Sequence, residues 1–342
     1  GNFNIMNDSN YSSMKFIFFS DTHLGFDYPV RPRSKRRRRG FDFFLQFEII
    51  LDYALSNNIK LLVHGGDLFF RTKIPLLIVD KVYHTLLDYA EKGLNFVIVP
   101  GNHESSRLPG SLIMQHPNIH VFRKPESFHF RFDDIRLTFS GFPFYRGDIR
   151  NNLKDLLKEL KKPETTDFHF LMMHQAVEGA QVGPANFTFR SREDVIRKED
   201  LPHDIDAVLA GHIHRQQVLK YQANEQGIPV VFAGSTERTS FAEKDETKGF
   251  YEITLKKNEK PWFKFIQLRT RPMVNITIEN ALWESLQLKN YLLERIKLLD
   301  PDAILNLKFQ CSDTAKLVNT EFLNEIIPKT MNVSVGYFSR KP

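Results

Sequence analysis

Short apolar runs alternate with longer amphipathic stretches in the first third of the chain. Strands are predicted at residues 15–19, 61–64 and 95–99, and helical apolar spacing occurs between them at residues 41–57 and 75–91. This strand-helix-strand order is typical of parallel strands joined by helical crossovers. The pattern therefore predicts a layered α/β fold.

Beyond Pro117 the predicted strands come closer together. Strands are expected at residues 120–122, 128–132, 135–140, 168–174 and 207–210, with a helix near 149–161. They indicate a second, mixed sheet. The last four strands, at residues 218–221, 230–233, 249–255 and 262–268, have no helices between them and predict an antiparallel meander.

The two ends of the chain differ from its middle. Residues 1–13 are rich in Asn and Ser without an apolar period, so we expect a disordered leader or a remnant of cloning. We expect one domain over residues 14–270 and a boundary at Arg271-Pro272. Residues 271–342 alternate predicted strands and helices, which indicates a small α+β domain.

Composition narrows the class of protein. The 342 residues are 42% hydrophobic, enough for a sizeable core, and no stretch reaches the roughly 18 apolar residues of a membrane span. The N-terminus lacks a secretory signal, so we expect a cytoplasmic protein without a membrane partner. With Cys311 as its one cysteine, the chain can build neither a disulfide framework nor a thiolate zinc cage. The formal charge of +6 favours a polyanionic partner.

Metal-binding residue types follow several predicted strands. Loops at the carboxyl ends of parallel strands meet in one crevice, and residues at i and i+2 of an extended segment point to one side. Seven nitrogen and oxygen ligands are thus expected to converge there: Asp21, His23, Asp67, Asn102, His174, His212 and His214.

Seven ligands of this mixture suit two metal ions better than a single zinc. Manganese is the first choice, while iron, zinc and magnesium stay open. Asp67 is the predicted bridge between ions about 3.5–4 Å apart, which would activate a water for in-line attack on phosphorus. The terminal ligands would be Asp21, His23 and His214 for one ion, and Asn102, His174 and His212 for the other.

His103 is left over for catalysis. It is adjacent to the ligand Asn102, so it can steady the transition state or protonate the leaving oxygen without binding metal.

The alternative for each residue is a structural role, because a lone His at a strand end is usually structural and Asp-x-His is common by chance. The order of all five motifs, each after a predicted strand, makes that alternative improbable for the set. We assign a structural role to His64, His84, His116, His120, His129, His169 and His203, although His64 lies close enough to Asp67 to support it.

This set of motifs resembles the calcineurin-like metallophosphoesterase superfamily, whose pattern D-x-H, G-D, G-N-H-[DE], H, G-H-x-H is met without a gap. The resemblance implies a four-layer sandwich of two mixed sheets flanked by helices, a dinuclear metal site and phosphoester hydrolysis. It covers nearly all of the chain after Met14.

Three stretches are similar to one branch of the superfamily, the SbcD-type DNA repair nucleases of the meiotic-recombination group. They are residues 21–25, residues 66–69, and residues 234–238 with Phe241 and 248–250. The tail from Pro272 resembles the capping domain that helps to hold DNA in that group.

The chain departs from the SbcD-type pattern in two places. Many members carry a His three residues after the bridging Asp, where this chain has Phe70, which puts the exonuclease step in doubt. Members also continue into a segment that grips an SbcC-type ATPase, and this segment is not evident before Pro342. That partner and a homodimer stay open alternatives.

A basic run follows the first predicted ligands and carries seven positive charges. Because a loop leaving the metal site would carry it, we favour contact with the DNA backbone over a solvated loop or a nuclear import signal. Three further basic residues close in sequence to Asp67 and His103 extend the expected surface. The full set is Arg31, Arg33, Lys35, Arg36, Arg37, Arg38, Arg39, Arg71, Lys73 and Arg107. Among aromatic residues, only Phe26 and Tyr28 are candidates for base stacking.

The favoured function is a manganese-dependent DNA nuclease, endonuclease or 3'-5' exonuclease, in DNA repair or end processing. A phosphodiesterase or phosphatase acting on a small nucleotide or lipid is the first alternative. A catalytically inert scaffold is the second, although such a protein would be expected to have lost ligands, and none is missing here.

Overall fold

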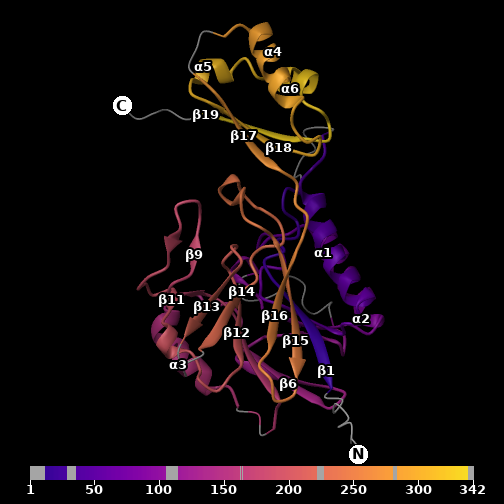
Figure 1. Ribbon diagram of the computed structural model, residues 1–342, viewed down its shortest axis with the longest axis vertical. Helices are drawn as coiled ribbons and strands as arrows, with labels where there is room; N and C mark the ends of the chain where they lie inside the picture. The colour runs from indigo at the N-terminus through magenta and orange to yellow at the C-terminus, as the bar shows by residue number, and fades with distance from the viewer. Residues whose placement is uncertain are drawn as a thin grey trace, which may run out of the picture. The chain divides into compact units, whose positions relative to one another are not determined.

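The computed structural model describes residues 12–28, 36–104, 115–161, 163, 165–221, 227–279 and 283–337 (Figure 1). The chain forms two compact units. The first comprises Gly1–Gly25, Phe43–Glu237 and Thr247–Leu268, and the second comprises Phe26–Asp42, Arg238–Glu246 and Arg269–Pro342, as far as these ranges are described.

The first sheet of unit 1 has six strands in the order β16-β15-β1-β2-β3-β4. Its parallel part consists of β1 (Ser13–Phe19), β2 (Leu61–His64), β3 (Asn95–Ile98) and β4 (Ile119–Val121). Helices α1 (Gly40–Ser56) and α2 (Leu76–Glu91) are the crossovers, and Figure 1 shows them side by side along this sheet. The Phe47 ring of α1 lies 6.3 Å from the Phe19 ring, centroid to centroid. The crossovers predicted from the apolar spacing are therefore present.

The second sheet also has six strands, in the order β13-β14-β12-β7-β6-β5. Its strands are β5 (Glu126–Phe132), β6 (Ile135–Gly141), β7 (Phe168–His174), β12 (Ala207–Gly211), β13 (Gln217–Tyr221) and β14 (Ile228–Phe232). Buried side chains of both sheets form one core, where the Phe16 ring meets Phe139 and Phe170 edge-on. Helix α3 (Ile149–Lys158) packs Ile149 and Leu153 on the other face. The predicted sandwich of two mixed sheets flanked by helices is confirmed.

The predicted antiparallel meander at the end of unit 1 is wrong. Strand β14 pairs antiparallel with β13 but parallel with β12, in the second sheet. Strands β15 (Gly249–Lys256) and β16 (Trp262–Gln267) form a hairpin whose β15 pairs with β1, in the first sheet. The chain between β14 and β15 thus crosses from one sheet to the other. Consecutive strands without helices predict hairpins but not the sheet that each hairpin joins.

Several short elements were not predicted. They are η1 (Asn102–Glu104), β8 (Ala176–Val177), β9 (Gln181–Val182), β10 (Phe187–Thr188), β11 (Val195–Ile196), η2 (Lys198–Asp200) and η3 (Phe241–Glu243). Most are two or three residues long, too short for an apolar period to show in the sequence.

Unit 2 contains a parallel sheet of β17 (Met273–Ile278), β18 (Ile304–Phe309) and β19 (Asn332–Tyr337). Helices α4 (Ser285–Ile296), α5 (Ser312–Ala315) and α6 (Thr320–Ile326) accompany it, with Leu288, Leu292 and Phe322 in a common core. Phe26–Asp42 and Arg238–Glu246, which the sequence placed inside the 14–270 domain, group with this unit. The role of the tail as a DNA-binding cap stays a prediction.

Among the described residues, no helix combines the length and the apolar character that a membrane span needs.

Candidate metal centre

The carboxyl ends of β1 and β2 carry the first predicted ligands in an unusual backbone conformation. Asp21, His23 and Asp67 have φ angles of 51°, 45° and 55°, and His212, which follows β12, has a φ of 89°. A left-handed conformation costs a non-glycine residue about 1–2 kcal/mol. Such strain persists where the surrounding structure enforces it, and it concentrates at functional sites. Four of the seven predicted ligands therefore share this strained conformation.

Asp67 is the centre of the site. Its side chain is 1% exposed, and its Oδ2 lies 2.7 Å from His103 Nδ1, 3.3 Å from His174 Nε2 and 3.6 Å from His23 Nε2. The backbone N–H of His103 also donates to Oδ1 of Asp67, over 3.1 Å. One buried carboxylate is thus surrounded by imidazoles from three separate segments of the chain.

Asn102 and His212 join this cluster from η1 and from the loop after β12. The side-chain oxygen of Asn102 lies 2.9 Å from His174 Nε2 and 3.3 Å from His212 Nδ1. The backbone N–H of His212 donates to Asp21 Oδ2 over 3.2 Å. Residues of both sheets therefore meet at one point.

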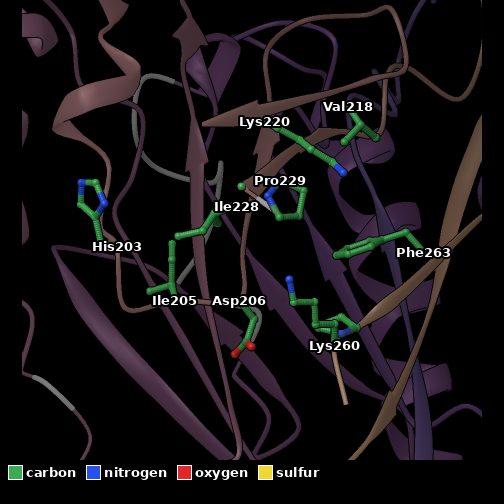
Figure 2. Close-up of a pocket in the computed structure, with 11 residues that line it drawn as sticks. His203, Ile205, Asp206, Val218, Lys220, Ile228, Pro229, Lys260 and Phe263 are labelled. Carbon is green, nitrogen blue, oxygen red and sulfur yellow. The ribbon is translucent and has the colours of Figure 1, made fainter. Parts of the chain in front are cut away.

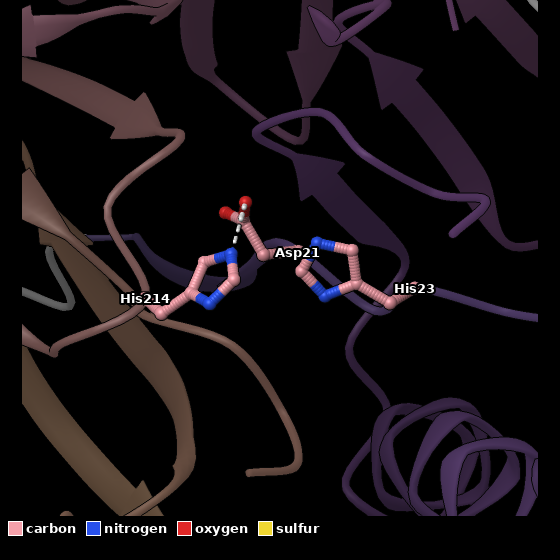
Figure 3. Close-up of side chains that lie close together, drawn as sticks. All are labelled: Asp21, His23 and His214. Atoms are coloured by element: carbon pink, nitrogen blue, oxygen red, sulfur yellow. Dashed lines mark ion pairs between the residues drawn. The ribbon is translucent and has the colours of Figure 1, made fainter. Parts of the chain in front are cut away.

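His214 lies beside Asp21 and His23. Figure 3 shows the three side chains, with the ion pair of His214 Nε2 and Asp21 Oδ1 at 4.0 Å. The rings of His214 and His23 are 4.7 Å apart between centroids. Each of these three residues offers one ligand atom, and the three atoms lie within 4.8 Å of one another.

Burial and charge shift the proton affinities in the cluster. Burial alone would raise the pKa of Asp67, but the charge of His174 and the close imidazoles of His103, His174 and His23 hold that pKa far below its usual range. Burial opposes protonation of His174, yet the charge and hydrogen bond of Asp67 raise its pKa to about 9. Burial lowers the pKa of His212 to about 3, and it also lowers the pKa of His23.

The donor atoms fit divalent cations. Asp21 Oδ1 and both ring nitrogens of His23 are buried and have no hydrogen-bond partner within the described structure, which is costly unless another group binds them. His174 Nδ1 lies 2.7 Å from the Gly65 carbonyl, which can only accept. Nε2 is then the nitrogen left to bind a metal, as second-shell hydrogen bonds usually arrange it. The clusters Asp21–His23–His214 and Asp21–Asp67–His174 each supply three ligand atoms.

A second layer of contacts holds the ligand loops. Buried His64 accepts the N–H of Gly66 at Nδ1 over 3.0 Å, and its Nε2 lies 3.0 Å from Thr22 Oγ1. Burial lowers the pKa of His64 to about 3, so the ring stays neutral. His64 therefore supports the loop of Asp67, as the sequence analysis expected.

Gly211 shows how closely the two sheets approach here. A Cβ on Gly211 would lie 2.1 Å from the carbonyl oxygen of Gly65, which excludes any side chain at this position. The approach explains why a glycine precedes His212.

The described part of the basic run belongs to unit 2, where its guanidinium groups have partners within the chain. Arg36 donates to three backbone carbonyls, at 2.7 Å for Pro328 and 3.3 Å for both Ile327 and Met331. Arg37 is 2.8 Å from Asp42 Oδ1. Arg36, and Arg37 through Asp302 Oδ1 at 3.5 Å, therefore hold together parts of the chain that are far apart in sequence.

The other basic candidates fall into two sets. The Arg38 guanidinium lies 3.0 Å from Asp27 Oδ1, and buried Arg39 donates to the carbonyl of Arg238 over 2.7 Å. Arg71 lies over the Phe70 ring at 5.2 Å, and exposed Lys73 is two residues further on, both in unit 1. Four predicted DNA contacts lie outside the described residues: Arg31, Arg33, Lys35 and Arg107.

A cavity of about 700 Å³ lies away from this chemistry (Figure 2). Its lining includes Asp206 and Ile228, which stand at the amino ends of β12 and β14, whereas the candidate ligands follow the carboxyl ends. Gly227, another lining residue, borders residues 222–226, which are not described. We assign the chemistry to the polar cluster, since the cavity brings together none of its residues.

A sandwich with this polar cluster between its sheets defines the class of metal-dependent phosphoesterases. Residues 14–216 match the family model of the calcineurin-like phosphoesterases, and the chain belongs to that family. The family uses a dinuclear metal site, and the Asp and His groups described above can bind such ions.

The chain is similar to archaeal proteins named DNA double-strand break repair protein Mre11. It is 23% identical to the one from Methanopyrus kandleri over 79% of this chain and 61% of the relative. It is 25% identical to the one from Archaeoglobus fulgidus, over 96% and 74%, and 24% identical to the one from Thermoplasma acidophilum, over 65% and 56%. The chain thus spans 61% of the length of the Methanopyrus relative.

Among solved structures, a dimetal phosphatase from Danio rerio overlaps 73% of this chain and 98% of its own, at 12% identity and a TM-score of 0.37. This score is too low to support any argument.

Proposed function

We propose that this protein is a manganese-dependent DNA nuclease that hydrolyses phosphodiester bonds in DNA repair or end processing. One observation carries the proposal: the buried Asp67 carboxylate lies among His103, His174 and His23, between two sheets of a phosphoesterase. The curated relatives, named for double-strand break repair, favour DNA among phosphodiester substrates.

In this proposal the seven candidate ligands are divided between two metal ions. Asp67 would be a ligand of both ions, Asp21, His23 and His214 would hold one of them, and Asn102, His174 and His212 would hold the other. When bound, such ions acidify a water and neutralise charge on the phosphate oxygens. The chain itself contributes the fixed positions of these donors, since several are buried and hydrogen-bonded to backbone.

His103 is proposed to act on the substrate. Its side chain is 40% exposed, whereas those of Asp67, His174 and His23 are at most 1% exposed. The Nδ1 bond to Asp67 orients the ring, so the imidazole is placed to give a proton to the leaving oxygen. The ring is also close enough to the cluster to bind a metal ion itself. Metal analysis of a His103 variant distinguishes this role from proton donation.

A substrate comparison tests the function. Purified protein with manganese is offered linear duplex DNA, circular single-stranded DNA and bis-p-nitrophenyl phosphate, with an Asp21→Ala variant as the inactive control. We expect cleavage of DNA as well as of the small ester, lost with EDTA and restored by manganese. Hydrolysis of the small ester alone would support a small-molecule phosphodiesterase. Inactivity on all three despite bound metal would support an inert scaffold.

Two partner questions belong to the same proposal. DNA is the proposed partner. A second copy of the chain and an SbcC-type ATPase are two further candidate partners, each with its own test. Sedimentation of the purified protein with and without such an ATPase measures both.

A further inference from the structure

We propose that Lys248 is a positioning residue of the metal centre, which fixes the His212–His214 loop of the second sheet against the first sheet. The inference rests on the proposed role of His214 as a ligand. Lys248 stands immediately before β15, directly after the stretch of chain that crosses between the sheets.

Lys248 is an unusual lysine because its side chain is buried. The residue is 1% exposed, and its ammonium donates to the carbonyl oxygen of His214 over 2.8 Å. Lysine is almost never fully buried unless its charge is bound, and a charged donor makes a stronger hydrogen bond than a neutral one. Because a buried ammonium is costly, we infer that this hydrogen bond fixes the backbone of His214.

The carbonyl of His214 is held from a second direction. The backbone N–H of Ser235 donates to it over 2.9 Å. A Cβ on the preceding Gly234, whose φ is 75°, would lie 2.6 Å from the same oxygen. The backbone after β14 thus packs directly on the backbone of His214.

Tyr251, three residues after Lys248, makes a second contact with the same loop. Its buried hydroxyl donates to the side-chain oxygen of Gln216, two residues after His214. Lys248 immediately precedes β15 of the first sheet and Tyr251 lies within that strand, while His214 and Gln216 follow β12 of the second sheet. Together they tie the second-sheet loop to the first sheet.

The first sheet supplies four of the seven candidate ligands, with Asn102 following β3, and the second sheet supplies three. Asp21, His23 and Asp67 follow strands of the first sheet, and His174, His212 and His214 belong to strands or loops of the second. A bound ion needs donors from both sheets at distances correct to a few tenths of an ångström. Lys248 is not a ligand, yet it sets the position of His214 relative to Asp21.

Manganese titration of the metal-free protein tests this. Lys248→Met keeps the side-chain length but removes the ammonium, and the carbonyl retains the Ser235 N–H, so folding should persist. We expect manganese affinity to fall about 10- to 100-fold for at least one ion, as losses of second-shell contacts do. Electron paramagnetic resonance should show weaker coupling between the two manganese ions. Lys248→Arg, which keeps a cationic donor, should recover part of the affinity.

Lys15→Met is the matched control. Lys15 lies at the other end of the same sheet, 46% exposed, with its ammonium 3.5 Å from Glu252. Its loss should leave manganese binding unchanged. Wild-type affinity and wild-type coupling in a folded Lys248→Met would overturn the proposal.

Two further variants keep the test decisive. Should Lys248→Met not fold, Tyr251→Phe, which removes one hydroxyl, should still weaken binding several-fold. Wild-type binding by both Tyr251→Phe and Lys248→Arg would then overturn the proposal. His214→Ala separates the ligand assignment from the positioning role. Unchanged manganese binding by His214→Ala would refute the ligand assignment itself. Weakened binding by His214→Ala, together with wild-type binding by Lys248→Met, would refute only the positioning role.

Discussion

The imidazole of His103 and the carboxylate of Asp67 face one another, with Nδ1 2.7 Å from Oδ2, although the two residues come from different loops. The contact links the residue proposed for proton transfer to the residue proposed to bridge the ions. A single carboxylate can thus place both the metals and the acid.

His103→Ala should abolish hydrolysis of DNA and leave both metal ions bound. The ring acts on the substrate in our proposal, while the remaining donors around Asp67 stay in place. Inductively coupled plasma analysis of metal content, beside an activity assay, checks both halves. Loss of an ion in this variant would assign His103 to coordination.

Asp67→Ala should reduce the content of both ions together. The Asp67 carboxylate lies 3.6 Å from His23 of one proposed site and 3.3 Å from His174 of the other. Without it, two cations would face each other unscreened. The same metal analysis applies, with Asp42→Ala as a control from outside the cluster. Wild-type metal content would remove Asp67 from the bridging role.

The first half of the fold was predictable because it is encoded locally. Apolar runs of four or five residues bounded by turn residues predicted β1, β2 and β3, and the polar residues after them were predicted to meet at the sheet edge. Asp21, Asp67 and Asn102 do so in the structure. Their roles as ligands remain predictions.

Other features could not be predicted because they depend on partners distant in sequence. Nothing near residue 249 shows that β15 pairs with β1, so the meander was predicted wrongly. Likewise, a run of arginines predicts phosphate contacts, but the carbonyls that Arg36 binds lie about 290 residues further along the chain. Only the folded structure reveals such acceptors.

Arg36→Ser should destabilise unit 2. Three backbone carbonyls would lose a charged donor, and each such contact contributes about 1.5–3 kcal/mol when well formed, less where solvent competes. We expect the thermal unfolding midpoint to fall by several degrees. Lys316→Ser, in the same unit, should leave the unfolding midpoint unchanged. Lys316 is exposed, and its ammonium lies 3.6 Å from the exposed Asp313 carboxylate.

The same arginine variant also tests the DNA prediction. If Arg36 contacts a phosphate, Arg36→Ser should reduce the salt dependence of DNA binding by about one unit of slope, whereas loss of a purely structural contact should not. Comparing Arg36→Ser with wild type below the unfolding temperature separates the two. An unchanged unfolding midpoint together with a reduced salt dependence of DNA binding would support a phosphate contact by Arg36.

Phe70 occupies the position where similar nucleases carry a second histidine. Its ring centroid lies 6.2 Å from that of His23 and 6.4 Å from that of His103, and its backbone N–H donates to Leu24 over 2.9 Å. The backbone is therefore fixed beside the metal cluster, but the side chain can neither donate a proton nor bind a phosphate oxygen. A step that needs an imidazole here would lack a contribution of about 10²- to 10⁴-fold.

We therefore expect weak exonuclease activity on duplex ends, with cleavage of single-stranded or looped DNA retained through His103. Phe70→His should raise the degradation of duplex ends relative to internal cutting. The new imidazole would stand beside His23 and His103, close to the Asp67 carboxylate that already orients the His103 ring. End-labelled duplex and circular single-stranded DNA, digested in manganese, give the ratio, and Phe70→Leu serves as a control that changes the ring without adding a donor. Vigorous digestion of duplex ends by the natural protein, with the ratio unchanged in Phe70→His, would show that this position does not govern the exonuclease step.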